Sequence, residues 1–374
     1  MKVMALGGVN RIGNSCYYLS LARQHFLLDC GKGGYGSYIC NPDFDALLRT
    51  ELCSLSQLDG IFLSHGHYDH VGSLSTLWEQ GFQLPVYATQ LTKALMDALL
   101  VDKFIYQAHD TRWKQVCRSI QNQQVNRSIC AVPYYSSIQK GAVTITFYPA
   151  GHVPGAAMIY FESPEGNVLY TGDFHSDESA LTEGYYLPNQ VNPDVVILCG
   201  THAKHPHYLP INSLEQDAEK IQRYLSRGKS VHLQVSQLTR GLETAHWIGT
   251  RMPQTKLYLD DHIWNLAQHM EEAGTAAVRP NFYRESDSMP LDAITIGGRE
   301  AHSHQVGMQV KFSLHATYGD CLNLIQQLSP SVVFLVHSPD DTRGDGGLQV
   351  LIDALGNQVC VLEPICGHLY DTEL

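Results

Sequence analysis

This chain of 374 residues contains no run of about 18 uninterrupted apolar residues, and no two of its cysteines stand at CxxC spacing. The first absence argues against a membrane-spanning helix, and the opening MKVMALGGVN has no apolar stretch long enough for a signal peptide. The ten cysteines are scattered through the chain, which is typical of reduced thiols and not of a disulfide framework or a cysteine zinc site. We therefore expect a cytoplasmic protein that does not enter a membrane.

Charge is also scarce. Charged residues make up 17% of the chain, against about 25% in ordinary soluble domains, and 25 Lys plus Arg against 37 Asp plus Glu give a formal net charge of −12. An acidic chain is poorly suited to broad adhesion to nucleic acid or anionic membrane, although a local basic groove remains compatible with it. Histidine, by contrast, is plentiful at 19 residues, and it is the commonest metal ligand in proteins.

The pattern of apolar residues predicts two kinds of structure. The length suits two or three domains, or one large domain with an insertion. The first half shows short β-type runs with one long helical stretch at Gln90–Tyr106, whereas strands and helices alternate after about residue 205, as in a small parallel α/β layer. The expected strands of the second part are Ser230–Val235 and Lys256–Leu259, and the expected helices are Leu242–Ile248, Ile263–Met270 and one that begins at Asn212 and ends at Gly228.

Chemistry-bearing residues follow the ends of several predicted strands. Three histidines and an aspartate lie within six residues at His65–His70, and His152, Asp173 and His337 each follow an apolar strand. Strand ends converge on one rim of a sheet, so we expect these side chains to meet. Imidazole and carboxylate ligands suit zinc, and His65 with His67 can face one ion while Asp69 and His70 face another. The alternative is that these are surface histidines without a function, which is the usual case for a single histidine. The dense spacing of His65–His70 argues against that alternative.

These motifs resemble those of a known family. The segment Ser64–His70, His152 in Gly-His-x-Pro-Gly and Asp173 in Thr-Gly-Asp-Phe are similar to the metallo-β-lactamase superfamily. Further segments, spread over nearly the whole chain, resemble the β-CASP branch of this superfamily. That branch comprises the nucleases related to ribonuclease J and the pre-mRNA 3′-end-processing endonuclease. The segments are Leu6–Cys16, Leu28–Gly31, Thr239-Arg240-x-x-Glu243, Phe312-Ser313-Leu314-His315-Ala316 and Leu335-Val336-His337.

The resemblance implies an α/β fold, an αββα sandwich with an inserted α/β cap. We expect the sandwich to comprise residues 1–204 and 301–374 and the cap residues 205–300. The resemblance further implies two Zn²⁺ ions, one on His65, His67 and His152 and one on Asp69, His70 and His337, with Asp173 bridging them. It assigns catalysis to Asp69 and to His315, the latter as general acid, and its motifs place Arg240 and Ser313 among the substrate-binding residues.

Two departures from the family pattern bear on the substrate. Cys199 stands where the branch carries an acidic residue that orients the general-acid histidine, and a thiol cannot balance the charge of an imidazolium. Either another group holds His315, or the protein is slow or acts on an atypical substrate. The cap is also about half the usual length, and Gly297-Gly298-Arg299 is the candidate remnant of a glycine-rich segment that normally precedes the Phe-Ser-x-His motif.

The leading hypothesis is a zinc-dependent ribonuclease that acts on single-stranded RNA, because RNA-directed members of the family tend to carry a histidine at the position of His337. DNA is a possible substrate, and a dimer is a possible oligomeric state. The alternatives are a hydrolase of a small phosphodiester or ester, and a non-catalytic scaffold subunit.

Other candidates receive plainer interpretations: a solvated loop for His202, His205 and His207 beside Lys204, a polar surface for His302 and His304, and core packing for Trp113, Trp247 and Trp264.

Overall fold

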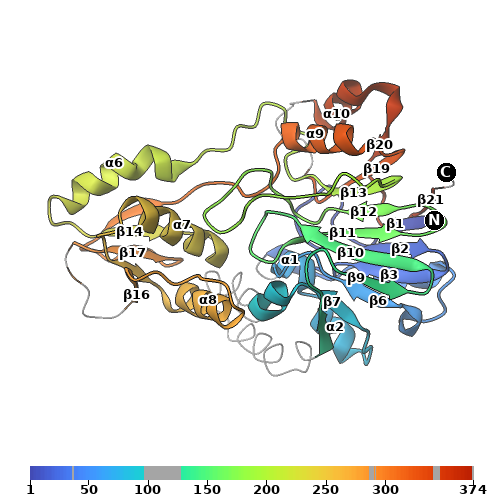
Figure 1. Ribbon diagram of the computed structural model, residues 1–374, viewed down its shortest axis with the longest axis horizontal. Coiled ribbons are helices and arrows are strands. Elements are labelled where there is room, and N and C mark those ends of the chain that lie inside the picture. The colour runs from blue at the N-terminus through green and yellow to red at the C-terminus, as the bar shows by residue number, and fades with distance from the viewer. Residues whose placement is uncertain (36–37, 97–127, 286–289, 291, 340–345, 373–374) are drawn as a thin grey trace.

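The computed structural model describes residues 1–35, 38–96, 128–285, 290, 292–339 and 346–372, and most of the predicted helix Gln90–Tyr106, together with Trp113, lies outside them. Two seven-stranded sheets face each other in one body, and a smaller body with a five-stranded sheet stands beside them (Figure 1). Both described ends of the chain lie in the first of the large sheets, where strand β1 pairs with β21.

The first large sheet joins an antiparallel part to a parallel part. Strands β21 to β3 pair antiparallel, and β3 to β8 pair parallel. In spatial order its strands are β21 (Leu369–Asp371), β1 (Lys2–Ala5), β2 (Tyr17–Leu21), β3 (Gln24–Leu28), β6 (Gly60–Phe62), β7 (Val86–Ala88) and β8 (Ile129–Ala131). A ribbon of β4 (Gly33–Tyr35) and β5 (Tyr38–Cys40) and the short helices η1 (Phe44–Arg49) and η2 (Leu55–Gln57) connect β3 to β6.

The second large sheet has the same mixed character. Its order is β20 (Cys360–Leu362), β19 (Val332–Val336), β13 (Val195–Cys199), β12 (Val168–Tyr170), β11 (Ala157–Glu162), β10 (Val143–Pro149) and β9 (Ser137–Lys140). The hairpin of β11 and β12 turns at Ser163–Gly166, as the sequence predicts. The strands β12, β13 and β19 run parallel, so their carboxyl ends, which lead to Asp173, Cys199 and His337, lie at one edge.

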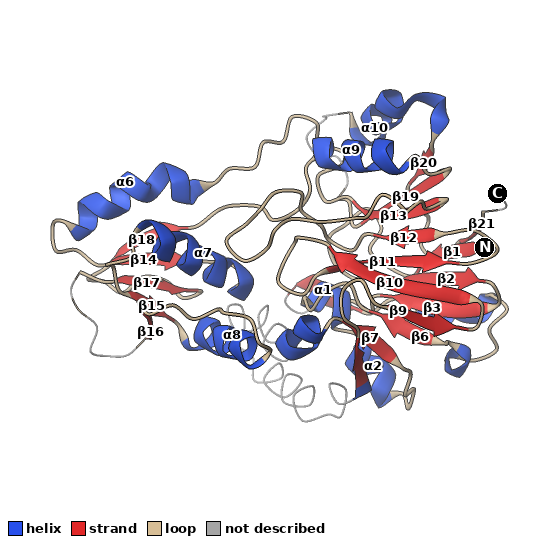
Figure 2. Ribbon diagram, viewed as in Figure 1, coloured by secondary structure: helices blue, strands red, loops and turns tan. Residues whose placement is uncertain are grey.

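Aromatic side chains fill the space between the two large sheets. Phe62 packs against Phe26, Tyr87 and Phe161, with ring centroids 4.9–5.4 Å apart. Helices cover the outer faces (Figure 2): α1 (Tyr68–Val71) and α2 (Leu74–Glu79) lie on the first sheet, and α9 (Tyr318–Leu328) and α10 (Gly347–Leu355), which leads into η3 (Gly356–Gln358), on the second. The predicted αββα sandwich is therefore confirmed.

The smaller body is the predicted cap. Its strands pair parallel throughout, in the order β16 (Phe282–Arg284), β15 (Leu257–Leu259), β17 (Ile294–Gly297), β14 (Val231–Gln234) and β18 (Val306–Gln309), and its helices are α6 (Ser213–Leu225), α7 (Leu238–Arg251) and α8 (Asp261–Glu272). Asn212 caps α6 through its side chain, as expected. The sheet runs past the expected boundary at residue 300, because β18 pairs with β14.

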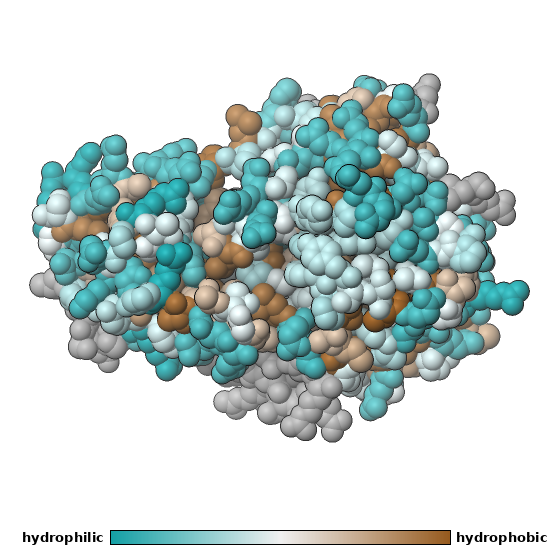
Figure 3. All heavy atoms as spheres, in the orientation of Figure 1, coloured by the Kyte–Doolittle hydropathy of each residue, from teal (hydrophilic) through white to brown (hydrophobic). Residues whose placement is uncertain are grey.

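Side chains of the cap reach across to the sandwich. The buried carboxylate of Glu243 on α7 accepts hydrogen bonds from Ser179 Oγ at 2.7 Å and from the backbone of Ala180 at 2.8 Å. Figure 3 shows a largely hydrophilic face on both bodies, with apolar side chains gathered where they meet. Among the described helices, none is long and apolar enough to cross a membrane.

Candidate metal centre

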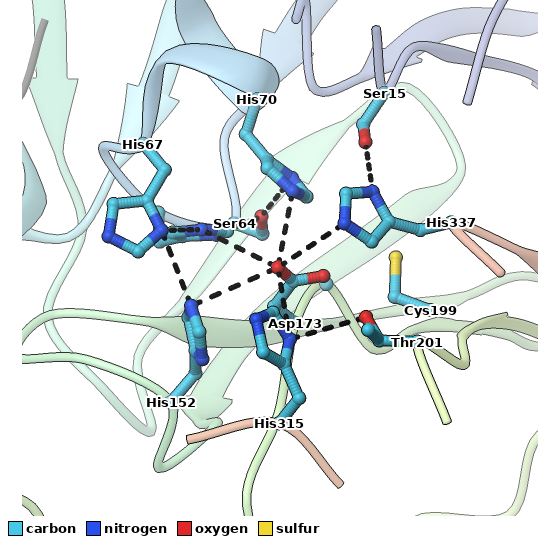
Figure 4. A network of polar contacts seen from close by, with 12 residues as sticks. Ser15, Ser64, His67, His70, His152, Asp173, Cys199, Thr201, His315 and His337 are labelled. Carbon is cyan, nitrogen blue, oxygen red and sulfur yellow. Dashed lines mark hydrogen bonds and ion pairs between the residues drawn. The ribbon is translucent and has the colours of Figure 1, made fainter. Parts of the chain in front are cut away.

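The histidine-rich motif occupies the loop and the short helix that follow strand β6. His67 is the residue before α1, and Asp69 and His70 lie within that one-turn helix, so consecutive ligands are presented from a short, tightly folded segment. The side chains of His65 and His70 are fully buried and His67 is nearly so. The predicted partners His152, Asp173 and His337 come to the same point from other loops (Figure 4).

The first three predicted ligands form a close group of ring nitrogens. His67 Nδ1 lies 3.0 Å from His65 Nε2 and 3.3 Å from His152 Nε2. Zinc–nitrogen bonds of about 2.0–2.1 Å in a tetrahedral site place ligand atoms roughly 3.3 Å apart, so the spacing suits one ion. Burial lowers the pKa of each ring, to about 3 for His67. The imidazoles are therefore neutral near pH 7 and keep the lone pairs that metal binding needs.

The second predicted group surrounds the carboxylate of Asp173. Asp69, His70 and His337 offer ligand atoms within 4.8 Å of one another. Asp173 Oδ2 lies 3.4 Å from His70 Nε2, 3.7 Å from His337 Nε2, 3.8 Å from His152 Nε2 and 4.0 Å from His65 Nε2. This central position between the two groups is the one expected of a bridging ligand.

Unsatisfied buried atoms show that this donor set fits metal ions. Among the residues that the structure describes, the buried atoms His70 Nε2, His337 Nε2 and Asp173 Oδ1 find no hydrogen-bond partner. Leaving a buried polar atom unpaired costs about 1–3 kcal/mol, and a cation in contact with these atoms would remove that penalty. The seven predicted ligands are thus brought together with their donor atoms facing one another, and their role as ligands stays a prediction.

The second nitrogen of each ring contacts the surrounding protein, which fixes how the ring is turned. His152 Nδ1 donates to the carbonyl of Leu314 at 2.7 Å, and His337 Nδ1 lies 2.8 Å from Ser15 Oγ. His65 Nδ1 lies 3.0 Å from Ser64 Oγ, and His67 Nε2 lies 3.4 Å from Thr239 Oγ1 on the cap helix α7. Such outer contacts select the tautomer and the orientation of ligating histidines.

Asp29 is the functional residue that the sequence reasoning missed. Its carboxylate accepts hydrogen bonds from Ser64 N and Oγ, both at 2.7 Å, from His70 Nδ1 at 2.6 Å and from Tyr170 Oη at 2.5 Å. Burial alone would lower the pKa of His70, but the carboxylates of Asp173 and Asp29 outweigh it and raise that pKa. The motif Leu28–Gly31 contained this residue, but its role depends on partners far away in the sequence.

His315 reaches the centre, and its neighbour is Thr201, not Cys199. His315 Nδ1 lies 3.5 Å from Asp173 Oδ2 and 3.3 Å from Thr201 Oγ1. The buried Sγ of Cys199 instead lies 3.8 Å from Tyr170 Oη, and burial raises the pKa of this thiol well above its ordinary value. Another group therefore does contact His315, which is the first of the two possibilities that the missing carboxylate left open.

A cleft between the sandwich and the cap opens beside His315. It has a volume of about 680 Å³, and both predicted substrate-binding residues, Arg240 and Ser313, line it. Ser313 Oγ accepts a hydrogen bond from the backbone N–H of His315 at 3.2 Å, and Arg240 donates to Ser236 Oγ at 3.1 Å. Arg240 and Lys311 are cations, and the described residues that line this cleft include no carboxylate.

The interpretation of His202, His205 and His207 beside Lys204 as a solvated loop was wrong for the buried His205 and Lys204, whereas His207 is exposed. Lys204 is 2% exposed and donates to Glu363 Oε1 at 2.6 Å, His205 is buried, and His202 stacks on Tyr208. Lys204 is thus held by a partner that local spacing does not reveal. By contrast His302 and His304 are exposed, and Trp247 and Trp264 pack on the core of the cap, as predicted.

Comparisons with known proteins show the family to which the chain belongs. Residues 9–215, more than half of the chain, match the model of the metallo-beta-lactamase superfamily. The chain is similar to the ribonuclease TTHA0252 of Thermus thermophilus, with 26% identity over 70% of this chain and 58% of the relative. It is also similar to the transcription termination factor FttA of Methanothermobacter thermautotrophicus (29%, over 70% and 42%) and the endoribonuclease YSH1 of Gibberella zeae (28%, over 65% and 29%).

The matches leave much of each relative uncovered, from 42% to 71% of its length in these three. A crystal structure of a protein of unknown function from Enterococcus faecalis V583 superposes on 99% of this chain and 99% of its own, with a TM-score of 0.65 and 14% sequence identity. That likeness supports the fold, cap included, because it extends over both bodies.

Proposed function

Since the chain belongs to the metallo-β-lactamase superfamily and, as predicted, to its β-CASP branch, we propose that it is a zinc-dependent phosphodiesterase that cleaves single-stranded RNA. The observation that carries this proposal is the meeting of two ligand groups and His315 around Asp173, at the mouth of a cleft with two cations. Two Zn²⁺ ions would be held by these groups, and Asp173 would be a ligand common to both.

When bound, such ions supply a Lewis acid that activates water and balances charge on the phosphodiester oxygens. The chain's own residues then have three tasks. Asp29 and the other outer partners hold the ligating rings in one orientation, Asp69 contributes its carboxylate to the second group, and Arg240 holds a phosphate in the cleft. His315, held by Thr201 and lining the cleft, gives a proton to the leaving oxygen.

Two observations support RNA as the substrate. The cleft concentrates positive charge in a chain whose net charge is −12, which suits a polyanion that binds at one small site. Two of the similar proteins are named as ribonuclease and endoribonuclease. The nine cysteines that the structure describes are free, which suits the reducing cytoplasm as the place of action.

The proposal is tested by metal analysis of the purified chain together with incubation on end-labelled single-stranded RNA, single-stranded DNA and a small phosphodiester. We expect about two zinc ions per chain and RNA cleavage that disappears in His315→Ala and Asp69→Asn. Turnover of the small phosphodiester alone would replace the proposal with a small-substrate hydrolase. Metal-free protein without turnover would leave a scaffold, and cleavage of DNA in preference to RNA would also overturn the proposed substrate.

A further inference from the structure

Two aromatic rings form a stacked pair at the wall of the cleft. The rings of His202 and Tyr208 have centroids 3.9 Å apart and planes inclined by 15°. Two consecutive turns bring them together: the N–H of His205 donates to the carbonyl of His202, and the N–H of Tyr208 to that of His205, both at 3.0 Å. The pair is therefore held by the backbone of a short segment that folds back on itself.

The pair lies close to the proton donor. His202 Nε2 lies 3.3 Å from Ser313 Oγ, and the centroids of the His202 and His315 rings are 6.2 Å apart. Both stacked residues line the same cleft as Arg240 and Lys311. A group held against this pair would therefore be next to the position at which His315 acts.

Core packing does not account for the pair. Tyr208 is partly exposed and is absent from the hydrophobic clusters formed by the described residues, and the next residue, Leu209, is 80% exposed. The tyrosine thus lies at a solvent-accessible wall, where the ring contact found for it among the described residues is the one with His202. Aromatic side chains beside cations are the combination that binds single-stranded nucleic acid, because bases stack on the rings while the cations balance the phosphates.

We propose that the stacked His202–Tyr208 pair is a nucleobase platform that takes a base of single-stranded RNA adjoining the cleaved phosphodiester. This inference rests on the proposed function and adds to it a base-binding surface outside the metal centre. Because every base has an aromatic face, the platform would favour an unpaired base over a position without a base, and would discriminate little among the four bases.

Binding is measured on metal-free protein, so that no cleavage intervenes. The probes are a fluorescein-labelled oligoadenylate of about 12 nucleotides and an abasic oligomer of the same length and charge. We expect the wild type to bind the oligoadenylate at least about tenfold more tightly, and Tyr208→Ala to lose that preference while its affinity for the abasic oligomer is unchanged. Tyr208→Phe, which keeps the ring, should retain it.

The matched control is Tyr283→Ala, which removes a ring from another stacked pair, Tyr258–Tyr283, outside the cleft; it should bind as the wild type does. Unfolding temperatures of all variants show that each is folded. Equal binding of both oligomers by the wild type, or an unchanged preference in Tyr208→Ala, overturns the platform while RNA cleavage by the zinc-loaded wild type upholds the proposed function. Absence of both RNA binding and RNA cleavage in the wild type overturns the proposed function itself.

Discussion

Thr201 Oγ1 lies 3.3 Å from Nδ1 of His315. Two residues earlier, Cys199 is buried against Tyr170 and takes no part in this contact. The hydroxyl of Thr201, and not the thiol of Cys199, therefore contacts His315 beside the carboxylate of Asp173. Unlike a carboxylate, a hydroxyl can donate or accept, so it fixes the ring without adding a charge.

The contact of Thr201 with His315 predicts a loss in the chemical step. Thr201→Val keeps the volume but removes the hydroxyl, and one hydrogen bond contributes about 0.5–1.5 kcal/mol, so kcat should fall roughly 2- to 10-fold with KM little changed. Thr201→Ser should retain most of the activity. Steady-state kinetics on single-stranded RNA provides the measurement, and equal losses in the Val and Ser variants would contradict the role.

Removing the charge of Asp29 should weaken metal binding. In Asp29→Asn an amide N–H faces His70 Nδ1, which favours the tautomer with its proton on Nε2, the atom that faces Asp173. Loss of such an outer partner typically reduces metal affinity 10- to 100-fold, and zinc competition with a chromogenic chelator should show this for one of two ions.

Tyr170→Phe is the matched control for Asp29→Asn, because it removes only one of the four hydrogen bonds to that carboxylate. Its zinc affinity should stay closer to that of the wild type. An Asp29→Asn protein that binds both ions as tightly as the wild type would show that Asp29 only supports the fold.

The metal-free protein should become less stable as it is acidified. The pKa of His67 is about 3 in the folded chain against an ordinary value of 6.5, and burial is the main cause. Between these values the unfolded chain binds a proton that the folded chain does not, so stability falls as the pH drops below about 6.5.

Urea unfolding in EDTA at about pH 7.5 and 5.5 would measure this loss. In His67→Gln the difference between the two pH values should be smaller, because the glutamine does not titrate. An equal pH dependence in the variant and the wild type would mean that other groups cause the loss.

Glu243 should link the cap to the sandwich in a way that depends on pH. Burial raises the pKa of this carboxyl in the folded chain, so the folded chain holds its proton more tightly than the unfolded chain does. This adds to the free energy of unfolding fully below the ordinary pKa of 4.5, and the added free energy is lost as the pH rises through the raised pKa. Relative to Glu243→Gln, the wild type should therefore lose stability as the pH rises above about 4.5.

Glu243→Ala should be the more damaging change at any pH. It leaves the Ser179 hydroxyl and the Ala180 N–H without their acceptor, at a cost of about 1–3 kcal/mol. Chemical unfolding of both variants across that pH range is the measurement, and a constant difference between the wild type and the Gln variant would argue against a raised pKa.

The sequence predicts those parts of the site that local spacing encodes. His65–His70 lie on one loop and one helical turn, so their spacing already indicates that they share a centre. The contacts of Ser15 with His337 and of Leu314 with His152 join residues more than 160 positions apart, and no local pattern contains them. Lys204 was misread for the same reason, since its partner Glu363 follows 159 residues later.

The fold shows the same division. The alternation of apolar strands and helices predicts the parallel cap from β14 and β15, whose residues are almost all buried in its sheet. Three strands of the cap were not predicted: β17, although all four of its residues are buried, and the edge strands β16 and β18, which have only one buried residue each and so little hydrophobic pattern.

The segment that leaves strand β18 carries Ser313, Leu314 and His315 directly into the metal centre. The orientation of His152 and the position of His315 thus depend on the same few residues that connect the cap to the sandwich. A hinge at this point would not simply widen the entrance; it would shift a ligand's support and the proton donor in one movement. A movement of the cap would therefore be coupled to the positions of both His152 and His315.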